Sequence, residues 1–408
     1  MTRSRIARLL HLGDGRYATK PITETLRGYG PTTKRFSLVG EGMTIEDVGE
    51  LAGRRADPED RRARALHTLA VSVHADRRFQ SALGRPLAWP GYLLLELLPH
   101  GRTLPRLDPD RNQFAHYSST ANSGVIRFES SEDGIHACLS SDICVHEVVH
   151  ALLHAARGWI DADRETRAVA ECIGDTFSML LAADHQEIRK AALASSPDLT
   201  NSNLLSLFAD LPDGRFLRDA SRALHWDDVD RQDSYAMAKV VGSALYGALR
   251  RTFAILAPDM GPEKALSEAV LRLSRAVLGA IDSLPPERVR IRALAREVTR
   301  RAEPDLAEAL GRAWEEAGID ASPAEEAAVL RSLASVGVDP EEVVGGLERE
   351  LGGVIELCGL HEQQPRARAM FPLAGQRTHE FVWRSAGSTR TGCLTTDLRG
   401  NATALSFS

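Results

Sequence analysis

The sequence predicts an α+β protein with a lobe of strands and helices, a mainly helical lobe, and an α+β appendage at the C-terminus. Two short runs typical of strands, 113–117 and 125–129, flank the turn-forming residues SSTANSG. From residue 142 to about residue 318, apolar residues recur at helical spacing between glycine and proline breaks. A mixed half followed by a helical half favours an α+β arrangement with a cleft between the lobes.

Each element before this helical half has its own signal. Up to about residue 55, short apolar runs punctuated by Gly and Pro predict loops and strands, with a helix at 44–51. Charge pattern and apolar spacing predict a long helix over 57–82. The segment 90–109 is rich in Pro and Gly, and it contains a predicted short helix at 92–98.

Glycines, prolines and polar turns divide the helical half into separate helices. The expected breaks are Gly158, 210–214, 258–261, Pro285-Pro286 and Pro304. Further on, one or two helices are expected up to about residue 357, and the remaining residues are typical of strands and turns. The chain divides into an N-terminal region at 1–84, a main domain at 85–320 with a central helix at 142–157, and an appendage at 321–408.

Composition and charge narrow the class of protein. The 408 residues are 43% hydrophobic and 26% charged, which is typical of a soluble globular protein. A formal net charge of −6 gives no electrostatic footprint for nucleic acid. No segment approaches the roughly 20 apolar residues of a membrane span, and the polar N-terminus is not typical of a secretion signal. The five cysteines form an odd, scattered set that fits reduced thiols in the cytoplasm.

The strongest signal for function is HEVVH, which places His146, Glu147 and His150 in the predicted central helix. Positions i and i+4 lie on one face of a helix, so both imidazoles can bind the same tetrahedral metal ion. Glu147 is offset from that face, yet it is near enough to reach a water on the metal. Because zinc lowers the pKa of its bound water to roughly 7, a carboxylate can accept the water's proton at neutral pH.

The surroundings of HEVVH strengthen a motif that by itself is a moderate signal. Ser141 or Asp142 is suited to cap the start of the helix, and Gly158 is suited to end it. Apolar residues surround the histidines, as a buried site requires: Val145, Val148, Val149, Leu152 and Leu153. Cys144 and Cys172, near the candidate site in sequence, are expected to be buried apolar residues rather than ligands.

A catalytic zinc ion needs a third protein ligand and an open fourth position. Glu171 and Asp175 lie one helical turn apart in the next apolar helix, and buried carboxylates are costly unless they are paired or bind metal. We expect Glu171 to be the third ligand and Asp175 to accept a hydrogen bond from the other ring nitrogen of a ligand histidine. The alternative is a polar helix stripe in which both carboxylates form surface ion pairs. His154 continues the histidine row, and we expect it to be a packed residue.

HEVVH, followed about twenty residues later by ECIGD, resembles the gluzincin metallopeptidases, in particular their thermolysin and fungalysin branch. Residues 142–147 resemble the DVVAHE-type opening of the family's zinc helix, and Glu171 with Asp175 resembles its E-x-x-x-D element. The resemblance covers about 85–320. It implies a zincin (thermolysin-like) catalytic fold, a Zn²⁺ ion held by two histidines and a glutamate, and Glu147 as general base.

Weaker segments of the resemblance imply further roles. Asn112 corresponds to the family's edge-strand Asn, which holds the substrate backbone, and Arg218 to an Arg that binds a substrate carbonyl. The family's oxyanion-stabilising His falls on Tyr235, whose phenol can donate the same hydrogen bond. His225 is the alternative donor. The family's acidic calcium-binding segment is missing after Asp175, so calcium sites are not supported.

The expected function is zinc-dependent hydrolysis of peptide bonds, with a peptide or protein as partner and without nucleic acid or membrane. The favoured form is a cytoplasmic endopeptidase that, by the resemblance, cleaves before a bulky apolar residue. One alternative is a maturation protease for a single dedicated peptide partner, with 321–408 as its docking module. Another is a catalytically inactive, zinc-stabilised regulatory or binding protein; loss of the oxyanion His favours it, and retention of Glu147 argues against it.

Overall fold

The computed structural model describes most of the chain between residues 35 and 321 and four strands after it. The described residues are 35–39, 60–90, 92, 94–105, 114–120, 123–132, 134–159, 163–210, 216–284, 289–321, 354–362, 376–385, 388–397 and 402–407. The last four ranges are described by their backbone. The predicted helix at 44–51 lies outside the described residues, and so does Asn112.

The first lobe is built on a four-stranded sheet with the strand order β1-β2-β5-β4. Its strands are β1 (Phe36–Leu38), β2 (Leu95–Leu98), β4 (Ala115–Ser119) and β5 (Gly124–Phe128). β1, β2 and β5 are parallel, and β4 pairs antiparallel with β5, so one edge of β4 is unpaired among the described strands. The strands predicted at 113–117 and 125–129 are confirmed, with shifts of one or two residues.

The short helix predicted at 92–98 is wrong, because this segment contains strand β2. Leu95 and Leu97 are fully buried and Glu96 between them is half-buried, which is the alternation of a strand. β2 lies between β1 and β5, and pairing on both sides satisfies its backbone. The apolar run LLLELL is too short for its periodicity to distinguish a buried strand from a buried helix.

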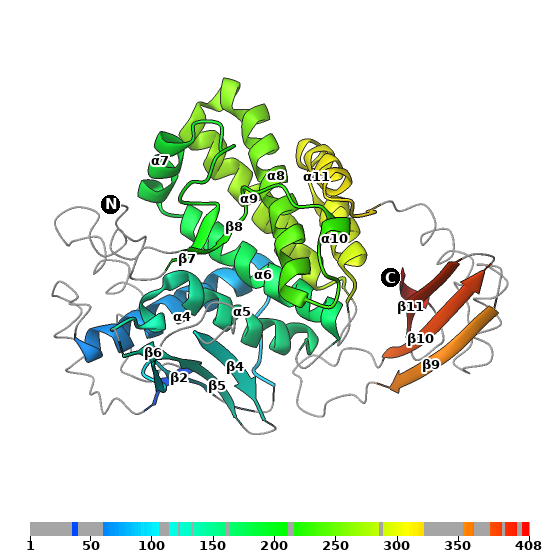
Figure 1. The fold of residues 1–408 in the computed structure, drawn as a ribbon, viewed down its shortest axis with the longest axis horizontal. Helices are drawn as coiled ribbons and strands as arrows, with labels where there is room; N and C mark the ends of the chain where they lie inside the picture. Colours follow the sequence, from blue (N-terminus) through cyan, green and yellow to red (C-terminus); the bar gives the residue numbers. More distant parts are fainter. Residues whose placement is uncertain are drawn as a thin grey trace.

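Helices α4 (Arg61–Leu83) and α5 (Ser141–Arg157) pack against each other and against this sheet (Figure 1). α4 contacts β1, and α5 contacts β4 and β5. α4 confirms the helix predicted at 57–82, and its apolar residues share one core with those of the main domain. α5 is therefore held between the sheet on one side and the helical lobe on the other (Figure 1).

The ends of α5 follow from local chemistry and confirm the helix predicted at 142–157. Its N-cap is Ser140, which precedes both predicted caps, and the Ser140 side-chain oxygen accepts a hydrogen bond from the Ile143 N–H at 3.3 Å. Gly158 ends the helix as predicted, with a left-handed φ of 75° that favours glycine. Because both ends of α5 are fixed, His146 lies in its second turn and His150 one turn later.

The second lobe is mainly helical, as the sequence predicts. Its helices are α6 (Arg164–Ala183), α7 (Gln186–Ser195), α8 (Ser234–Met260), α9 (Pro262–Ile281), α10 (Ile291–Arg301) and α11 (Pro304–Glu316). α6 is central, because it packs against α5, α8 and α9 (Figure 1). The predicted breaks at 258–261 and Pro304 are confirmed by the change from α8 to α9 and by the start of α11.

A hairpin that the sequence pattern does not predict interrupts the helical half. It consists of β7 (Leu207–Asp210) and β8 (Phe216–Asp219), and β7 contacts both α5 and α6. The remaining short elements are β3 (Thr103–Leu104), β6 (Ser130–Ser131), η2 (Ala137–Leu139) and η3 (Trp226–Asp228). The hairpin brings residues from between α7 and α8 to the junction of α5 and α6.

The C-terminal region contains a second four-stranded sheet, which is antiparallel and built from four consecutive strands (Figure 1). Its strands are β9 (Val354–Glu362), β10 (Gln376–Ser385), β11 (Ser388–Asp397) and β12 (Ala402–Phe407). The strands expected near the end of the chain are confirmed. The helix expected up to about residue 357 is wrong at 354–357, which belongs to β9 and pairs with β10.

One helix of the described part of the chain, α8, is long and apolar enough to cross a membrane by length and composition. Its most apolar window is 56% buried inside the protein. The core helix of a soluble protein has the same properties, so the structure is consistent with a soluble protein.

Candidate metal centre

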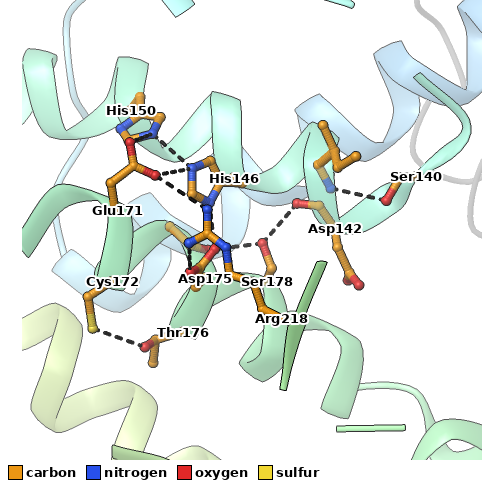
Figure 2. A network of polar contacts seen from close by, with 12 residues as sticks. Ser140, Asp142, His146, His150, Glu171, Cys172, Asp175, Thr176, Ser178 and Arg218 are labelled. Atoms are coloured by element: carbon orange, nitrogen blue, oxygen red, sulfur yellow. Dashed lines mark hydrogen bonds and ion pairs between the residues drawn. The ribbon is translucent and has the colours of Figure 1, made fainter. Parts of the chain in front are cut away.

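Two successive helices bring the predicted metal ligands together. α5 and α6 pack against each other, and His146 and His150 on α5 face Glu171 on α6 (Figure 2). The Nε2 atoms of the two histidines lie 2.9 Å apart. Glu171 places Oε2 at 3.1 Å from His146 Nε2 and Oε1 at 3.7 Å from His150 Nε2. Among the described side chains, these three form the one group of potential donors close enough to share a metal ion.

The separations between these atoms fit a tetrahedral zinc ion. Zinc bonds of about 2.0–2.1 Å at tetrahedral angles place neighbouring ligand atoms about 3.3 Å apart. The two imidazole nitrogens are 2.9 Å apart and His146 Nε2 lies 3.1 Å from Glu171 Oε2, both near that value, while the other oxygen of Glu171, Oε1, lies 3.7 Å from His150 Nε2. Two imidazoles and one carboxylate are also typical of catalytic zinc sites, which leave a fourth position open.

Glu171 provides independent support for a cation at this position. Its side chain is only 4% exposed, and its Oε2 faces His146 Nε2 at 3.1 Å and Arg218 Nη2 at 3.8 Å. Burial alone raises the pKa of Glu171, but the charges of His150 and His146 prevail and lower it to about 2. A buried carboxylate is costly unless a positive charge compensates it, and a metal ion would supply such a charge.

The two histidines differ in the protons they hold when no metal is bound. Burial lowers the pKa of His150 to about 4, so this imidazole is neutral and ready to be a ligand. Burial also disfavours a charged His146, but its hydrogen bonds with Asp175 and Glu171 raise its pKa to about 10. A metal ion therefore has to displace a proton from His146.

His146 is oriented by a second carboxylate and by a glycine on α6. Its Nδ1 lies 2.9 Å from Asp175 Oδ1, which is the contact predicted from the sequence. Arg218 donates a hydrogen bond to the other oxygen of Asp175, and its Nη2 lies 3.8 Å from Glu171 Oε2 (Figure 2). A Cβ at Gly174 would lie 2.8 Å from His146 Nδ1, so α6 approaches this ring closely only because position 174 has no side chain.

Glu147 lies next to the ligands without being one of them. Its side chain is 6% exposed, and its carboxylate hydrogen-bonds with the backbone N–H of Tyr117 on β4. Burial raises the pKa of Glu147 to about 7. A carboxylate with a pKa near neutral can both accept and return a proton at neutral pH, as a general base must.

A small pocket opens between the two lobes beside this carboxylate. Its walls come from α5, α6, β4 and the β7–β8 hairpin: Phe114, Ala115, Asp142, Ile143, His146, Glu147, Asp175, Ser178, Phe208 and Arg218. The pocket has about 30 Å³ of free volume, enough for about two water molecules. A candidate ligand, the candidate base and Arg218 thus share one pocket.

Tyr235, at the start of α8, lies between two guanidinium groups. The Cζ atoms of Arg167 and Arg218 lie 5.6 and 5.5 Å from the centre of its ring. Arg167 also donates a 3.4 Å hydrogen bond to the phenol oxygen, and its Nε lies 4.0 Å from Glu171 Oε1. Burial raises the pKa of Tyr235 to about 12, so its hydroxyl keeps its proton and can donate it in a hydrogen bond.

His225, the alternative oxyanion donor, lies elsewhere in the fold. Its ring packs against Gly318, where a Cβ would lie 2.5 Å from His225 Nε2. Its Nδ1 accepts a hydrogen bond from the Asp227 N–H at 3.2 Å. These contacts lie at the end of α11, whereas Tyr235 contacts Arg218 of the metal centre.

The other predicted residues near the centre are packed as expected. His154 is 9% exposed, and its Nδ1 lies 2.8 Å from the hydroxyl of Tyr117. Cys144 and Cys172 are fully buried, and burial raises the pKa of Cys172 to about 12. Neither thiol is therefore suited to ligate a metal.

Gly174, Tyr117 and Arg167 also belong to the centre, although the sequence analysis did not single them out. A glycine inside a helical, apolar run is a known signal of close packing, and this signal could have identified Gly174. Arg167 precedes Glu171 by one helical turn, so helical spacing could have placed it on the same face. Tyr117 acts through its backbone N–H, for which the sequence contains no signal.

Comparison with known proteins does not assign this chain. No protein-family model matches the sequence, and no curated protein matches it either. The functional argument therefore depends on the geometry of the candidate metal centre.

Proposed function

We propose that this protein is a zinc-dependent peptidase with a zincin-like fold, in which His146, His150 and Glu171 hold the metal. The observation that carries the proposal is the position of Glu147, a buried carboxylate beside the ligand group that hydrogen-bonds with edge strand β4. A structural metal site does not require a carboxylate there, whereas hydrolysis requires a base within reach of water.

Each residue of the centre has a chemical task in this proposal. A zinc ion bound here would polarise a carbonyl group and lower the pKa of a coordinated water to about 7. Glu147 accepts a proton from the attacking water and returns it to the leaving amine. Asp175 holds Nδ1 of His146, so that Nε2 faces the metal position.

The surrounding residues bind the peptide. Tyr235 donates a hydrogen bond to the oxyanion, and Arg218, which reaches the pocket, binds a substrate carbonyl. The unpaired edge of β4 pairs with an extended peptide, and Asn112 anchors its backbone. Phe114, Ile143 and Phe208 line the pocket and favour an apolar side chain next to the cleaved bond.

We further propose that the enzyme works in the cytoplasm. The described cysteines Cys138, Cys144 and Cys172 are buried and form no disulfide, and Cys144 donates a 3.3 Å hydrogen bond to the carbonyl of Cys138. Free thiols persist in the reducing cytoplasm, whereas oxidising compartments favour disulfides.

The test compares the parent protein with Glu147→Gln and with a matched control, Glu308→Gln. Glu308 lies on α11 with a 63% exposed side chain, and it pairs with Arg312 on the same helix. After zinc loading, metal content is measured by mass spectrometry, and each protein is incubated with a mixed peptide library. We expect one zinc per chain in all three proteins and a loss of at least about 100-fold in kcat for Glu147→Gln alone.

The other results separate the alternatives. Full zinc occupancy without cleavage by parent or control contradicts the peptidase and favours an inactive binding protein. No zinc in the loaded parent contradicts the metal site itself. The cleaved positions distinguish an endopeptidase from an exopeptidase, and cleavage confined to one peptide favours a dedicated maturation protease.

A further inference from the structure

Two tyrosines and a histidine form a partly buried chain of hydrogen bonds next to the candidate metal centre. The hydroxyl of Tyr92 lies 2.9 Å from that of Tyr117, which in turn lies 2.8 Å from His154 Nδ1. Tyr92 and His154 are 8% and 9% exposed. Burial raises the pKa of both tyrosines, so both phenols keep their protons. The chain connects strand β4, which carries Tyr117, to helix α5, which carries His154.

The residues around Tyr92 leave space for its hydroxyl and hold its ring in place. A Cβ at Gly124 would lie 2.4 Å from the hydroxyl oxygen of Tyr92, so the first residue of β5 has to be glycine. Trp89 stacks on Tyr92 with the ring centres 6.0 Å apart. The position of the Tyr92 hydroxyl is therefore fixed on several sides.

The backbone of Tyr117 meets Glu147 at the unpaired edge of β4. The Phe114 carbonyl accepts a hydrogen bond from the Glu129 N–H, toward β5. In an antiparallel pair, successive residues direct their backbone groups to opposite edges, so Ala115 and Tyr117 direct theirs to the unpaired edge. The N–H of Tyr117 is the one that bonds with the Glu147 carboxylate.

We infer that Tyr117 is a positioning residue for Glu147: its hydroxyl, held by His154, fixes the strand whose N–H orients the carboxylate. The inference rests on the proposed role of Glu147 as base. Among the described strands, only β5 pairs with β4, and the link to His154 ties β4 to the helix that carries Glu147 and both histidine ligands. Misplacement of a reacting group by about 1 Å can lower the rate by about 100-fold.

The first test is Tyr117→Phe, which removes the hydroxyl and keeps the ring and the backbone. We expect kcat to fall about tenfold, while KM and bound zinc stay at parent values. The matched control is Tyr246→Phe. Tyr246 is also buried, and its hydroxyl accepts a 2.6 Å hydrogen bond from Asn203 and donates one of 3.0 Å to the Leu199 carbonyl. It lies away from Glu147, so its loss should lower stability without lowering kcat.

A second pair of variants tests the link from the other side. His154→Asn keeps a hydrogen-bond acceptor near the position of Nδ1, whereas His154→Leu removes it. We expect parent-like kcat for the asparagine variant and the Tyr117→Phe defect for the leucine variant. These two His154 variants also test the inference if Tyr117→Phe does not fold. In a Glu147→Gln background, Tyr117→Phe should cause no further loss, because the residue through which it acts is absent.

A third measurement is independent of catalysis. Selective ¹⁵N labelling of the six tyrosines gives a simple spectrum, in which hydrogen exchange of the Tyr117 amide is followed. Exchange should be about tenfold faster in Tyr117→Phe and in Glu147→Ala, and unchanged in Tyr246→Phe. This readout decides the inference even if the parent cleaves no peptide, a result that would contradict only the proposed function. The inference is overturned if Tyr117→Phe changes neither the amide exchange nor kcat. It is also overturned if Tyr117→Phe lowers kcat in the Glu147→Gln background by the same factor as in the parent.

Discussion

Gly174 and His146 meet where α6 packs against α5, and their contact sets how closely the two helices approach. A side chain at position 174 would press on the Nδ1 edge of the ring, the edge that Asp175 holds. Displacing this edge would also turn Nε2 away from Glu171. One glycine thus affects both the ligand geometry and the hydrogen bond that orients it.

We therefore expect Gly174→Ala to weaken zinc binding by roughly 10- to 100-fold, the usual effect of disturbing a residue that orients a ligand. A competition titration against a chromophoric chelator measures this affinity. The control is Gly242→Ala in α8, where an added Cβ meets no atom within 4 Å. The control should bind zinc like the parent and be stabilised by about 0.5–1 kcal/mol. Parent-like zinc affinity in Gly174→Ala would show that the contact has no influence on the site.

The protonation of the two histidines predicts how zinc affinity depends on pH. His150 is neutral above a pKa of about 4, whereas His146 holds its proton up to a pKa of about 10. At low pH His146 keeps its proton, and this proton competes with zinc for the ring nitrogen. The zinc affinity of the protein should therefore rise about tenfold per pH unit between pH 8 and 9. Calorimetry at pH 8 in two buffers of different ionisation enthalpy should show about one proton released per zinc. A pH-independent affinity would contradict the hydrogen-bonded state of His146.

Sequence spacing was sufficient to bring the proposed ligands together but not to predict their surroundings. The i, i+4 pairs on α5 and α6 identified His146, His150, Glu171 and Asp175, because helical geometry converts spacing into direction. The contact between Tyr117 and Glu147 joins a strand and a helix through a backbone N–H, which any residue type provides. Such a contact depends on strand register, and register is set by tertiary pairing.

At the scale of secondary structure, the long helices with regular apolar spacing were predictable and the short strands were not. The helices predicted at 57–82 and 142–157 are present as α4 and α5, since each is long and ends at a glycine in the left-handed conformation. β2 and the β7–β8 hairpin have only four residues per strand. Segments this short carry too few positions to reveal a period, so their neighbours in the sheet decide their conformation.

The start of α5 offers a test at this scale. The buried side chain of Ser140 accepts the Ile143 N–H and so satisfies one of the free donors of the first turn. Ser140→Ala should lower the free energy of unfolding by about 1 kcal/mol, measured as a lower urea midpoint. Ser195→Ala at the exposed end of α7 is the control and should change it by less than about 0.5 kcal/mol. Equal urea midpoints for the two variants would contradict the capping role.

In the whole molecule, the candidate metal centre lies where the two lobes meet. The histidines come from the helix that packs on the sheet, whereas Glu171, Asp175, Arg218 and Tyr235 come from the helical lobe and its hairpin. The buried apolar residues of both lobes belong to one cluster, which joins the lobes without metal. Charge is also balanced without metal, because protonated His146 and Arg218 face the carboxylates of Glu171 and Asp175.

Metal removal should consequently lower stability without unfolding the protein. A balanced set of buried charges keeps the chelator-treated chain folded, and zinc at about 1,000 times its Kd should add about 4 kcal/mol by mass action. Thermal unfolding followed by circular dichroism should show one cooperative transition in chelator and a higher Tm with zinc. His150→Gln, which removes a ligand without adding charge, should have the same Tm with and without the metal. If the parent protein is unfolded in chelator, the hydrophobic core alone cannot hold the two lobes together. If zinc does not change the Tm of the parent, the three donor residues do not bind zinc.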